Sequence, residues 1–165
     1  MLSQTDAKIE MKPIGYIRTE YKTLEDMPIQ PKGAAASVAR IVLDAAYREG
    51  LADLGGFSHI YLIYYFHRSK GYSLTLKPFM DTKEHGVFAT RAPRRPNPIG
   101  LSIVRLLAID RNIVLVEGAD LLDGTPILDI KPYIAQFDRV TQASSGWMTA
   151  NEDEVTQAKS DHRFK

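Results

Sequence analysis

Three arginines occur in the proline-rich stretch from residue 86 to residue 102, and they are Arg91, Arg94 and Arg95. No acidic residue lies between positions 84 and 110. Each proline fixes its backbone φ, so the loop is expected to be stiff. Guanidinium groups donate several hydrogen bonds in one plane and bind phosphate, carboxylate or a base edge. The stretch therefore indicates an anion-binding or nucleotide-binding loop, although a structural proline turn with arginines paired elsewhere explains its composition equally well.

The elements that must position this loop are predicted to be mostly short strands. Alternating or continuously apolar runs predict strands over 9–19, 36–43, 59–66, 72–77, 86–90, 99–109, 113–119 and 127–134. Helical spacing of apolar residues predicts one helix over 45–54, and a capping box over 149–152 favours a short polar helix over 151–159. Residues 20–33 are expected to form an ordered loop. Many short strands with few helices predict a mostly β fold: a small antiparallel β-barrel with one or two short helices and an irregular C-terminal tail.

Two of these segments carry more specific expectations. Residues 59–66 are apolar without alternation, which is typical of a strand buried on both faces, and His59 within it is expected to satisfy a core hydrogen bond. The alternation in 72–77 places Leu74 and Leu76 on the same side. We expect a single barrel domain over 1–149, with 150–165 as its tail.

Composition narrows the classes of function. The 165-residue chain has a net charge of +1 and no cysteine, which excludes disulfides, a thiolate nucleophile and cysteine-based zinc sites. Asp120, Asp123 and Asp129 are not spaced like a calcium loop, so no metal is expected. The chain shows no secretory signal, and its longest apolar run, 60–66, is too short to cross a bilayer. These features predict a cytoplasmic protein without a membrane partner.

Five blocks of sequence, taken in order, resemble the TsaA-like family, which is also called YaeB, VirR or TrmO-like. The blocks are 13–15 with 17–19, 57–60 leading to 66–67, Arg91, 95–100, and 122–133. Together they cover most of the chain, from about residue 11 to about residue 134. Several blocks in the same order are far more specific than any single short motif.

The resemblance implies a β-barrel methyltransferase that uses S-adenosylmethionine and acts on tRNA. The bacterial members methylate N6 of N6-threonylcarbamoyladenosine, the modified base next to the anticodon. Such a transfer is a direct displacement at the sulfonium methyl, and it depends mostly on positioning and desolvation. We also expect a homodimer, because a compact barrel gains buried surface by pairing.

The resemblance assigns cofactor contacts to three places besides the arginine loop. They are Pro28, Ile29 and Gln30; His67 and Arg68; and the turn Leu122, Asp123, Gly124 and Thr125, whose backbone approaches the adenine. Ile29 stands where the family usually has arginine. Arg91 is the strongest candidate to bind the carboxylate of the methionine moiety. His67 and Asp123 are weak candidates for a general base, because both fall in matched motifs.

RNA contacts are assigned to the remaining polar residues of the arginine loop. Arg94 is expected to bind a tRNA phosphate, and Arg95 and Asn97 either contact RNA or organise the loop. In the second case, charge alone suggests that Arg95 pairs with Asp129. Tyr133 could stack on a base or pack in the core.

Two other functions remain open at this point. The chain could be a non-catalytic module that binds S-adenosylmethionine or RNA and acts in regulation, or a methyltransferase for a small molecule. Appearance of labelled methyl in a product separates the first alternative from an enzyme, and the identity of that product separates the second.

Overall fold

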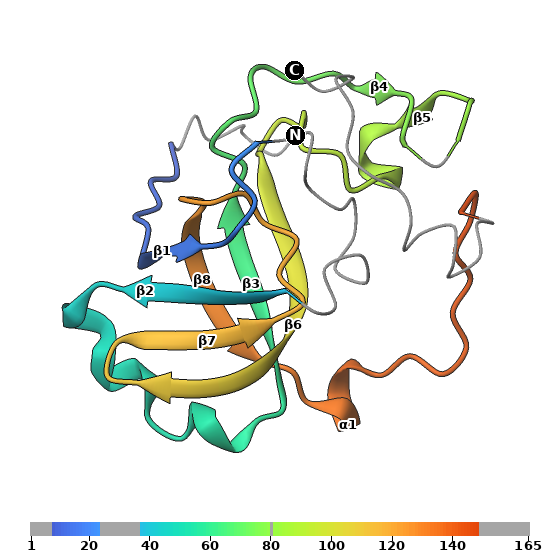
Figure 1. The fold of residues 1–165 in the computed structure, drawn as a ribbon. Helices are drawn as coiled ribbons and strands as arrows, with labels where there is room; N and C mark the ends of the chain where they lie inside the picture. The colour runs from blue at the N-terminus through green and yellow to red at the C-terminus, as the bar shows by residue number, and fades with distance from the viewer. Residues whose placement is uncertain (1–7, 24–36, 80, 149–165) are drawn as a thin grey trace.

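Six antiparallel strands close into a barrel, as the sequence predicts (Figure 1). The computed structural model describes residues 8–23, 37–79 and 81–148. Around the barrel the strands follow the order β1-β2-β7-β6-β3-β8. Their bounds are β1 Gly15–Arg18, β2 Val38–Leu43, β3 His59–Tyr65, β6 Ile99–Asp110, β7 Ile113–Glu117 and β8 Pro126–Pro132. The mostly β prediction is therefore confirmed.

Alternate side chains of each strand fill the barrel interior. This follows from the two-residue period of a strand, which sends every second side chain to the same face. The inward positions are apolar with few exceptions, and those that are nearly inaccessible to solvent include Ile17, Ile41, Ile60, Leu62, Val104, Val114, Val116 and Ile127. One continuous core thus supports all six strands.

The expected hairpin of 99–109 and 113–119 is present as β6 and β7. Its tight connection uses Arg111 with a positive φ of 54°, and the Asn112 side chain donates to the Leu43 carbonyl at 2.6 Å. A shift in register between Leu106 and Ala108 marks a bulge in β6. Bulges bend a strand and increase its twist, which helps a sheet to close on itself.

Shorter elements lie outside the barrel. They are the 3-10 helices η2 Ala45–Leu51, η3 Leu54–Gly56 and η4 Val87–Ala89, the two-residue strands β4 Thr75–Leu76 and β5 His85–Gly86, and the α-helix α1 Ala135–Asp138. β4 and β5 pair only with each other, at the upper right of the molecule (Figure 1). We call β4, β5 and η4 together the small module. The segment that follows α1 contacts this module, because Trp147 donates to the Ala89 carbonyl at 2.8 Å and its ring stacks on His85.

Several local predictions were wrong, each for a packing reason. The helix expected over 45–54 is two short 3-10 segments, a form common in brief connections. The strand β3 is not buried on both faces: its inward residues are buried, while Tyr61 and Ile63 are half-buried and Tyr65 is exposed. Its lack of alternation reflects apolar residues on the outside of the barrel as well as the inside.

The segments around the small module also differ from expectation. Leu74 is 61% exposed while Leu76 is buried, because only two residues of the expected 72–77 strand are in a strand. Most of the expected strand over 86–90 is the turn η4. The loop of 20–33 lies largely outside the described residues, and the helix of 151–159 and the tail of 150–165 lie wholly outside them.

Gly100 is a packing requirement of the barrel rather than a flexible point. A methyl group at this inward position of β6 would overlap the ring of Tyr64, its direct partner on the neighbouring strand β3. We therefore expect Gly100→Ala to lower the free energy of unfolding by about 1–3 kcal/mol, the usual cost of overpacking a core. Gly86→Ala is the matched control, since a methyl there meets no atom within 4 Å. Urea unfolding of both variants measures the difference, and equal midpoints would contradict this account.

Candidate functional site

The register of the barrel brings the predicted site segments to one end. Tyr65, the last residue of β3, pairs with Ile99, which directly follows the arginine loop. Tyr64 pairs with Ile127, next to the turn of 122–125. Loops that join paired strands emerge at the same end, so the arginine loop, the end of β3 and this turn lie together at the top of the barrel in Figure 1.

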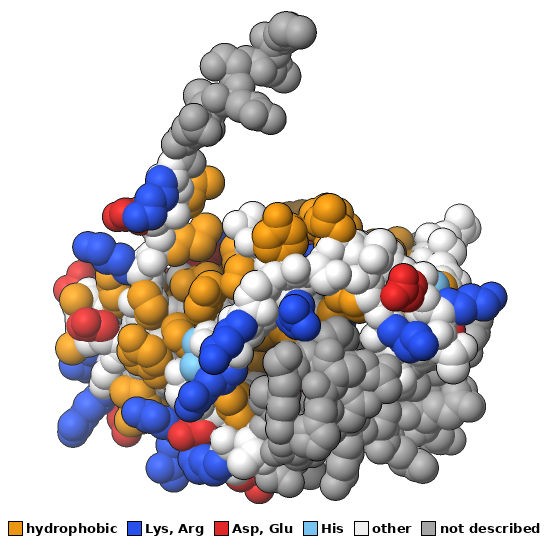
Figure 2. All heavy atoms as spheres, turned by 90° about the horizontal axis from the view of Figure 1, so that it is seen from above, with side chains coloured by type: hydrophobic (Ala, Val, Ile, Leu, Met, Phe, Trp, Pro, Cys, Tyr) orange, Lys and Arg blue, Asp and Glu red, His pale blue; other side chains and the backbone are white. Residues whose placement is uncertain are grey.

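This end of the molecule combines apolar and basic groups. Figure 2 looks down on it and shows hydrophobic side chains gathered on the surface, with Lys and Arg side chains along their border. Apolar surface bordered by a few polar groups is the usual character of a small-molecule site.

The arginine loop is fastened to the end of β3 by hydrogen bonds. The Phe66 amide donates to the Pro98 carbonyl at 2.8 Å, and the Ser69 hydroxyl donates to the Pro93 carbonyl at 3.1 Å. These bonds place His67, which lies between the two donors, beside the loop. The structure thus brings together two predicted cofactor segments that are separated by more than twenty residues in the sequence.

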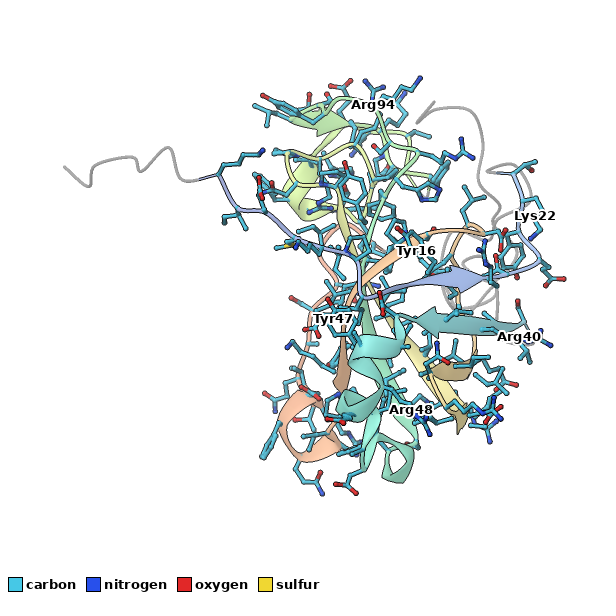
Figure 3. All side chains as sticks on the ribbon, turned by 90° about the vertical axis from the view of Figure 1, so that its left-hand side faces the viewer. Tyr16, Lys22, Arg40, Tyr47, Arg48 and Arg94 are labelled. Carbon is cyan, nitrogen blue, oxygen red and sulfur yellow. The ribbon has the colours of Figure 1, made fainter. Side chains whose placement is uncertain are left out.

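The three arginines of the loop have different surroundings. Arg91 is exposed, and its guanidinium makes no hydrogen bond or ion pair within the described residues. Arg94 lies at the upper end of the molecule (Figure 3), and its Nε is buried without a partner among those residues. Arg95 donates to the carbonyls of Thr90 at 3.1 Å and Ala92 at 3.3 Å. Within the described residues, Arg91 therefore keeps its donors available, whereas Arg95 organises the loop.

The suggested pair of Arg95 with Asp129 is wrong. Asp129 is instead bridged to Lys131 at 2.8 Å on the outside of β8. Asn97 is exposed, and its backbone carbonyl accepts from the Ile99 amide at 2.7 Å. An RNA-binding role for Arg94, Arg95 and Asn97 stays a prediction.

Hydrogen bonds from its backbone amides hold the turn of Leu122, Asp123, Gly124 and Thr125, mainly to β1 and the segment after it. Its amides at 123, 124 and 125 donate to the carbonyls of Tyr21, Ile17 and Leu122, at 2.8, 2.9 and 3.1 Å. Gly124 has a φ of 77°, a left-handed conformation that favours glycine. The carbonyls of Leu122 and Thr125 also accept hydrogen bonds, from the Thr125 amide and from the Ile17 amide. Within the described residues, the Leu122 amide and the carbonyls of Asp123 and Gly124 therefore remain for the predicted contact with an adenine.

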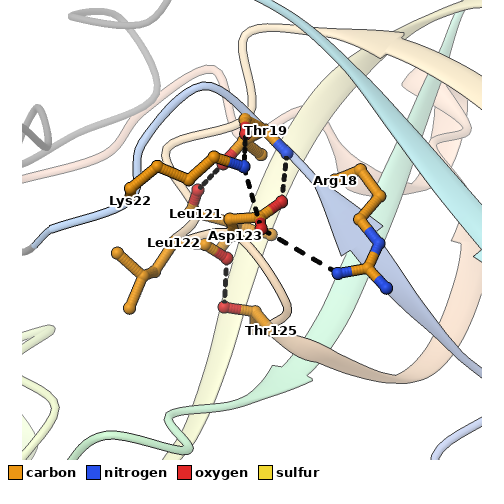
Figure 4. A network of polar contacts seen from close by, with 7 residues as sticks. All are labelled: Arg18, Thr19, Lys22, Leu121, Leu122, Asp123 and Thr125. Carbon is orange, nitrogen blue, oxygen red and sulfur yellow. Dashed lines mark hydrogen bonds and ion pairs between the residues drawn. The ribbon is translucent and has the colours of Figure 1, made fainter.

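Asp123 anchors the turn to the segment after β1 (Figure 4). One carboxylate oxygen accepts from the Thr19 amide at 3.0 Å, and the other lies 2.9 Å from Lys22 Nζ and 3.9 Å from the Arg18 guanidinium. The hydrogen bond from Lys22 is the main reason that the pKa of Asp123 is lowered. A carboxylate with a lowered pKa is a weak base, so this geometry argues for a structural role.

His67 is better suited to accept a proton. Partial burial, and next the charge of Arg68, lower the pKa of His67, so its imidazole is neutral at neutral pH. Its side chain makes no hydrogen bond to the residues that the structure describes. Of the two candidates for a general base, the geometry favours His67.

A buried polar chain inside the barrel was not anticipated from the sequence. The Tyr64 hydroxyl lies 3.2 Å from Ser102 Oγ, which donates to a carboxylate oxygen of Asp120 at 2.8 Å. Burial raises the pKa of Asp120, and the nearby charge of Arg91 opposes that rise. The sequence held one signal for this chain: Ser102 is a polar residue at an inward position of β6, between the inward residues Gly100 and Val104.

Other predicted residues lie elsewhere or outside the description. Pro28, Ile29 and Gln30 lie outside the described residues. Tyr133 is half-buried at the opposite end of the barrel, where its ring packs against Tyr61 and its amide donates to the His59 carbonyl. His59 bonds to the adjacent Ser58 hydroxyl at 2.9 Å, so the expected core hydrogen bond was wrong.

Within 8–23, 37–79 and 81–148, His, Asp and Glu side chains form no group of three or more that could hold a metal ion. In the same residues, no helix has the length and apolar character needed to cross a membrane.

A family model described as the tRNA-methyltransferase O N-terminal domain matches residues 16–139. A probable S-adenosyl-L-methionine-binding protein of Pyrococcus abyssi is 46% identical over 153 residues, which are 93% of this chain and 83% of that protein. The human tRNA (adenine(37)-N6)-methyltransferase is 35% identical over 77% of this chain and 30% of its own length.

The fold also matches solved structures. The crystal structure of TrmO from Pseudomonas aeruginosa superposes with a TM-score of 0.72 and 38% identity, over 86% of this chain and 63% of that chain. The present chain thus spans less than two thirds of that TrmO and about a third of the human enzyme.

The two aspartates of this region should respond to pH in opposite ways. Asp120→Asn keeps an acceptor for Ser102 but removes a buried charge, so we expect a higher free energy of unfolding than wild type at neutral pH. Because the folded-state pKa of Asp120 is raised, that gain should grow as the pH rises from about 4 and level off above the raised pKa. Asp123→Asn should instead lower stability at neutral pH. The difference in free energy of unfolding between wild type and Asp123→Asn should shrink as the pH falls below about 4, because the folded-state pKa of Asp123 is lowered.

Urea unfolding of both variants over a series of pH values tests this contrast. Parallel stability curves for wild type and Asp120→Asn would contradict the assignment of Asp120 as a buried, destabilised carboxylate.

Proposed function

The chain belongs to the tRNA-methyltransferase O N-terminal domain family, and from that membership we propose that it is an S-adenosylmethionine-dependent methyltransferase that acts on tRNA. The observation that carries the proposal is that the guanidinium of Arg91, which makes no hydrogen bond or ion pair within the described residues, lies near enough to Asp120 for its charge to lower the pKa of that carboxyl. Both lie at the barrel end where the predicted cofactor segments meet.

The residues present fit the proposed cofactor. The methionine moiety carries a carboxylate, and Arg91 has donors with no partner among the described residues that could bind it. The sulfonium carries a positive charge, and a cation bound near Asp120 would favour the ionised form of this carboxyl, whose pKa burial raises. When bound, the cofactor supplies a methyl group activated for displacement.

The chain's own contribution to the reaction is positioning and proton removal. The hydrogen bonds between the arginine loop and the end of β3 fix Arg91 and His67 relative to each other, which is the kind of pre-arrangement that accelerates a two-substrate transfer. A neutral His67 can accept the proton that the attacking nitrogen must lose. We place the reacting nitrogen near His67.

We further propose N6 of threonylcarbamoyladenosine next to the anticodon as the methyl acceptor. The human relative's name, tRNA (adenine(37)-N6)-methyltransferase, supports a tRNA adenine as substrate. Arg94, Arg95 and Asn97 on the same loop would then face the RNA, with Arg94 binding a phosphate through the terminal nitrogens of its guanidinium, because its Nε is buried. A cytoplasmic location accords with such a substrate.

We also propose that the protein works as a homodimer. The outer face of β3 and β6 carries cross-strand apolar pairs, Ile63 with Leu101 and Tyr61 with Ile103. Leu101 is 56% and Ile103 43% exposed. Apolar surface of this kind on a soluble barrel marks a protein interface, and a second copy of the chain would cover it.

Loss of Arg91 should weaken cofactor binding selectively. We expect calorimetric titration of wild type with S-adenosylmethionine to saturate at about one per chain. Arg91→Ala should bind about 10-fold to 100-fold more weakly, the equivalent of a charge-assisted hydrogen bond. Arg48→Ala is the matched control, because Arg48 is exposed and lies at the opposite end of the molecule (Figure 3).

Assays with labelled cofactor then separate the alternative functions. Label in tRNA supports the proposal, label in a small molecule alone indicates a small-molecule methyltransferase, and binding without any transfer indicates a regulatory module. No saturation of wild type up to millimolar S-adenosylmethionine would overturn the cofactor assignment.

A single charged residue introduced on the outer face of β6 should dissociate the proposed dimer into monomers. Light scattering at micromolar concentration is expected to give twice the chain mass for wild type and the chain mass for Ile103→Lys, which places an ammonium group in the apolar interface. Val140→Lys is the control, because Val140 is 71% exposed and lies outside the barrel. A monomer mass for wild type at that concentration would rule the dimer out.

A further inference from the structure

Two arginines face each other on the outside of the barrel. Arg18 on β1 and Arg40 on β2 are direct cross-strand partners, and both are exposed. Directly opposed residues of an antiparallel pair have Cβ atoms about 4.5–5.5 Å apart, and like charges in such a pair are destabilising. The strand register holds Arg18 and Arg40 opposite each other, so an anion bound between them would reduce their repulsion.

The carboxylates nearby do not neutralise this pair. Asp123 is shared between Lys22 at 2.9 Å and Arg18 at 3.9 Å, so one acid faces two cations. The Arg40 side chain has no ion pair within the described residues. Glu117, which lies diagonally from Arg40 on β7, is already bridged to Arg105 at 3.1 Å. Arg18, Lys22 and Arg40 therefore form a locally uncompensated basic face.

An aromatic side chain adjoins these cations. Tyr16 lies two residues before Arg18 on the same outward face of β1, and it is 47% exposed. Figure 3 shows Tyr16, Lys22 and Arg40 on the side of the molecule that carries β1 and β2. Cations that track a backbone, combined with an aromatic ring on which a base can stack, are the usual way in which proteins bind unpaired nucleic acid.

The basic face is continuous with the proposed methyl-transfer site. Asp123, which holds Arg18 and Lys22, belongs to the turn that is expected to approach the cofactor (Figure 4). An RNA strand that places one base at the barrel end would therefore have its neighbouring nucleotides within reach of β1 and β2.

We propose that Tyr16, Arg18 and Arg40 form a second RNA-binding face, on which Arg40 binds a backbone phosphate and Tyr16 stacks on an unpaired base of the tRNA. This inference rests on the proposed tRNA substrate. It adds contacts on β1 and β2 to those of the arginine loop. A bound phosphate also removes the repulsion between the two arginines, so RNA binding relieves a strain that the free protein carries.

Affinity for tRNA, measured over a series of salt concentrations, tests the role of each residue. Arg40→Gln should bind about 5-fold to 10-fold more weakly near 0.1 M salt, and the slope of log affinity against log salt should fall by about one unit. Tyr16→Leu should lose about 10-fold or more, whereas Tyr16→Phe retains the ring and should bind like wild type. Arg139→Gln, an exposed arginine that follows α1, is the control and should change neither quantity.

A stability measurement separates binding from folding. Because Arg40→Gln removes a like-charge pair, its urea midpoint should equal or exceed that of wild type while its RNA affinity falls. Equal tRNA affinity for Arg40→Gln, Tyr16→Leu and Arg139→Gln would overturn the inference. A loss of tRNA affinity in Arg40→Gln that is explained by a lower urea midpoint would also overturn it.

A titration with S-adenosylmethionine keeps this test apart from that of the proposed function. If wild type binds S-adenosylmethionine and methylates tRNA but Arg40→Gln keeps full RNA affinity, only the second RNA face is wrong. If wild type binds tRNA through Arg40 and Tyr16 but does not bind S-adenosylmethionine, the face stands and the methyltransferase proposal fails. If an acidic polypeptide displaces tRNA from wild type and binds in an Arg40-dependent manner with higher affinity, the face belongs to a protein partner and the inference is overturned.

Discussion

The pairing of β3 with both β6 and β8 is the constraint on which the site depends. Because β3 lies between β6 and β8 and runs antiparallel to both, the end of β3, the start of β6 and the start of β8 must lie at one end of the barrel. A shift of one residue in either pairing would turn every inward side chain outward, so the apolar core fixes the register. The same contacts that stabilise the barrel therefore also bring the three loops together.

Within that frame, the two aspartates before β8 have opposite surroundings. Asp120 contacts the barrel interior through Ser102, and burial disfavours its charge, whereas Asp123 lies three residues later among cations that favour its charge. The protein thus keeps a destabilised carboxylate near Arg91 and a stabilised one in the supporting turn. Strongly shifted groups tend to gather at functional sites, which agrees with the placement of Asp120 there.

The sequence predicts the barrel because strand periodicity and turn residues are local signals. The hairpin of β6 and β7 follows from alternation around Asp110 and Asn112, and the matched motifs predict that Arg91 and His67 belong to one site. The chain Tyr64–Ser102–Asp120 could not be predicted, because it joins residues up to 56 positions apart whose contact depends on the closed register. The pair Arg95–Asp129 was wrong for the same reason: opposite charge in a sequence carries no information about distance.

The arginine loop combines a fixed backbone with an arginine side chain that is available for binding. Its backbone is held by bonds from Phe66 and Ser69, and Arg95 adds two bonds to loop carbonyls. These contacts fix the loop without using Arg91, whose donors have no partner in the part of the chain that the structure describes. A charged group on a fixed backbone loses less entropy when a ligand binds, so the free energy of its contacts is available for affinity. Arg95 thus organises the loop so that Arg91 can bind, and the prolines add stiffness because each fixes its own φ.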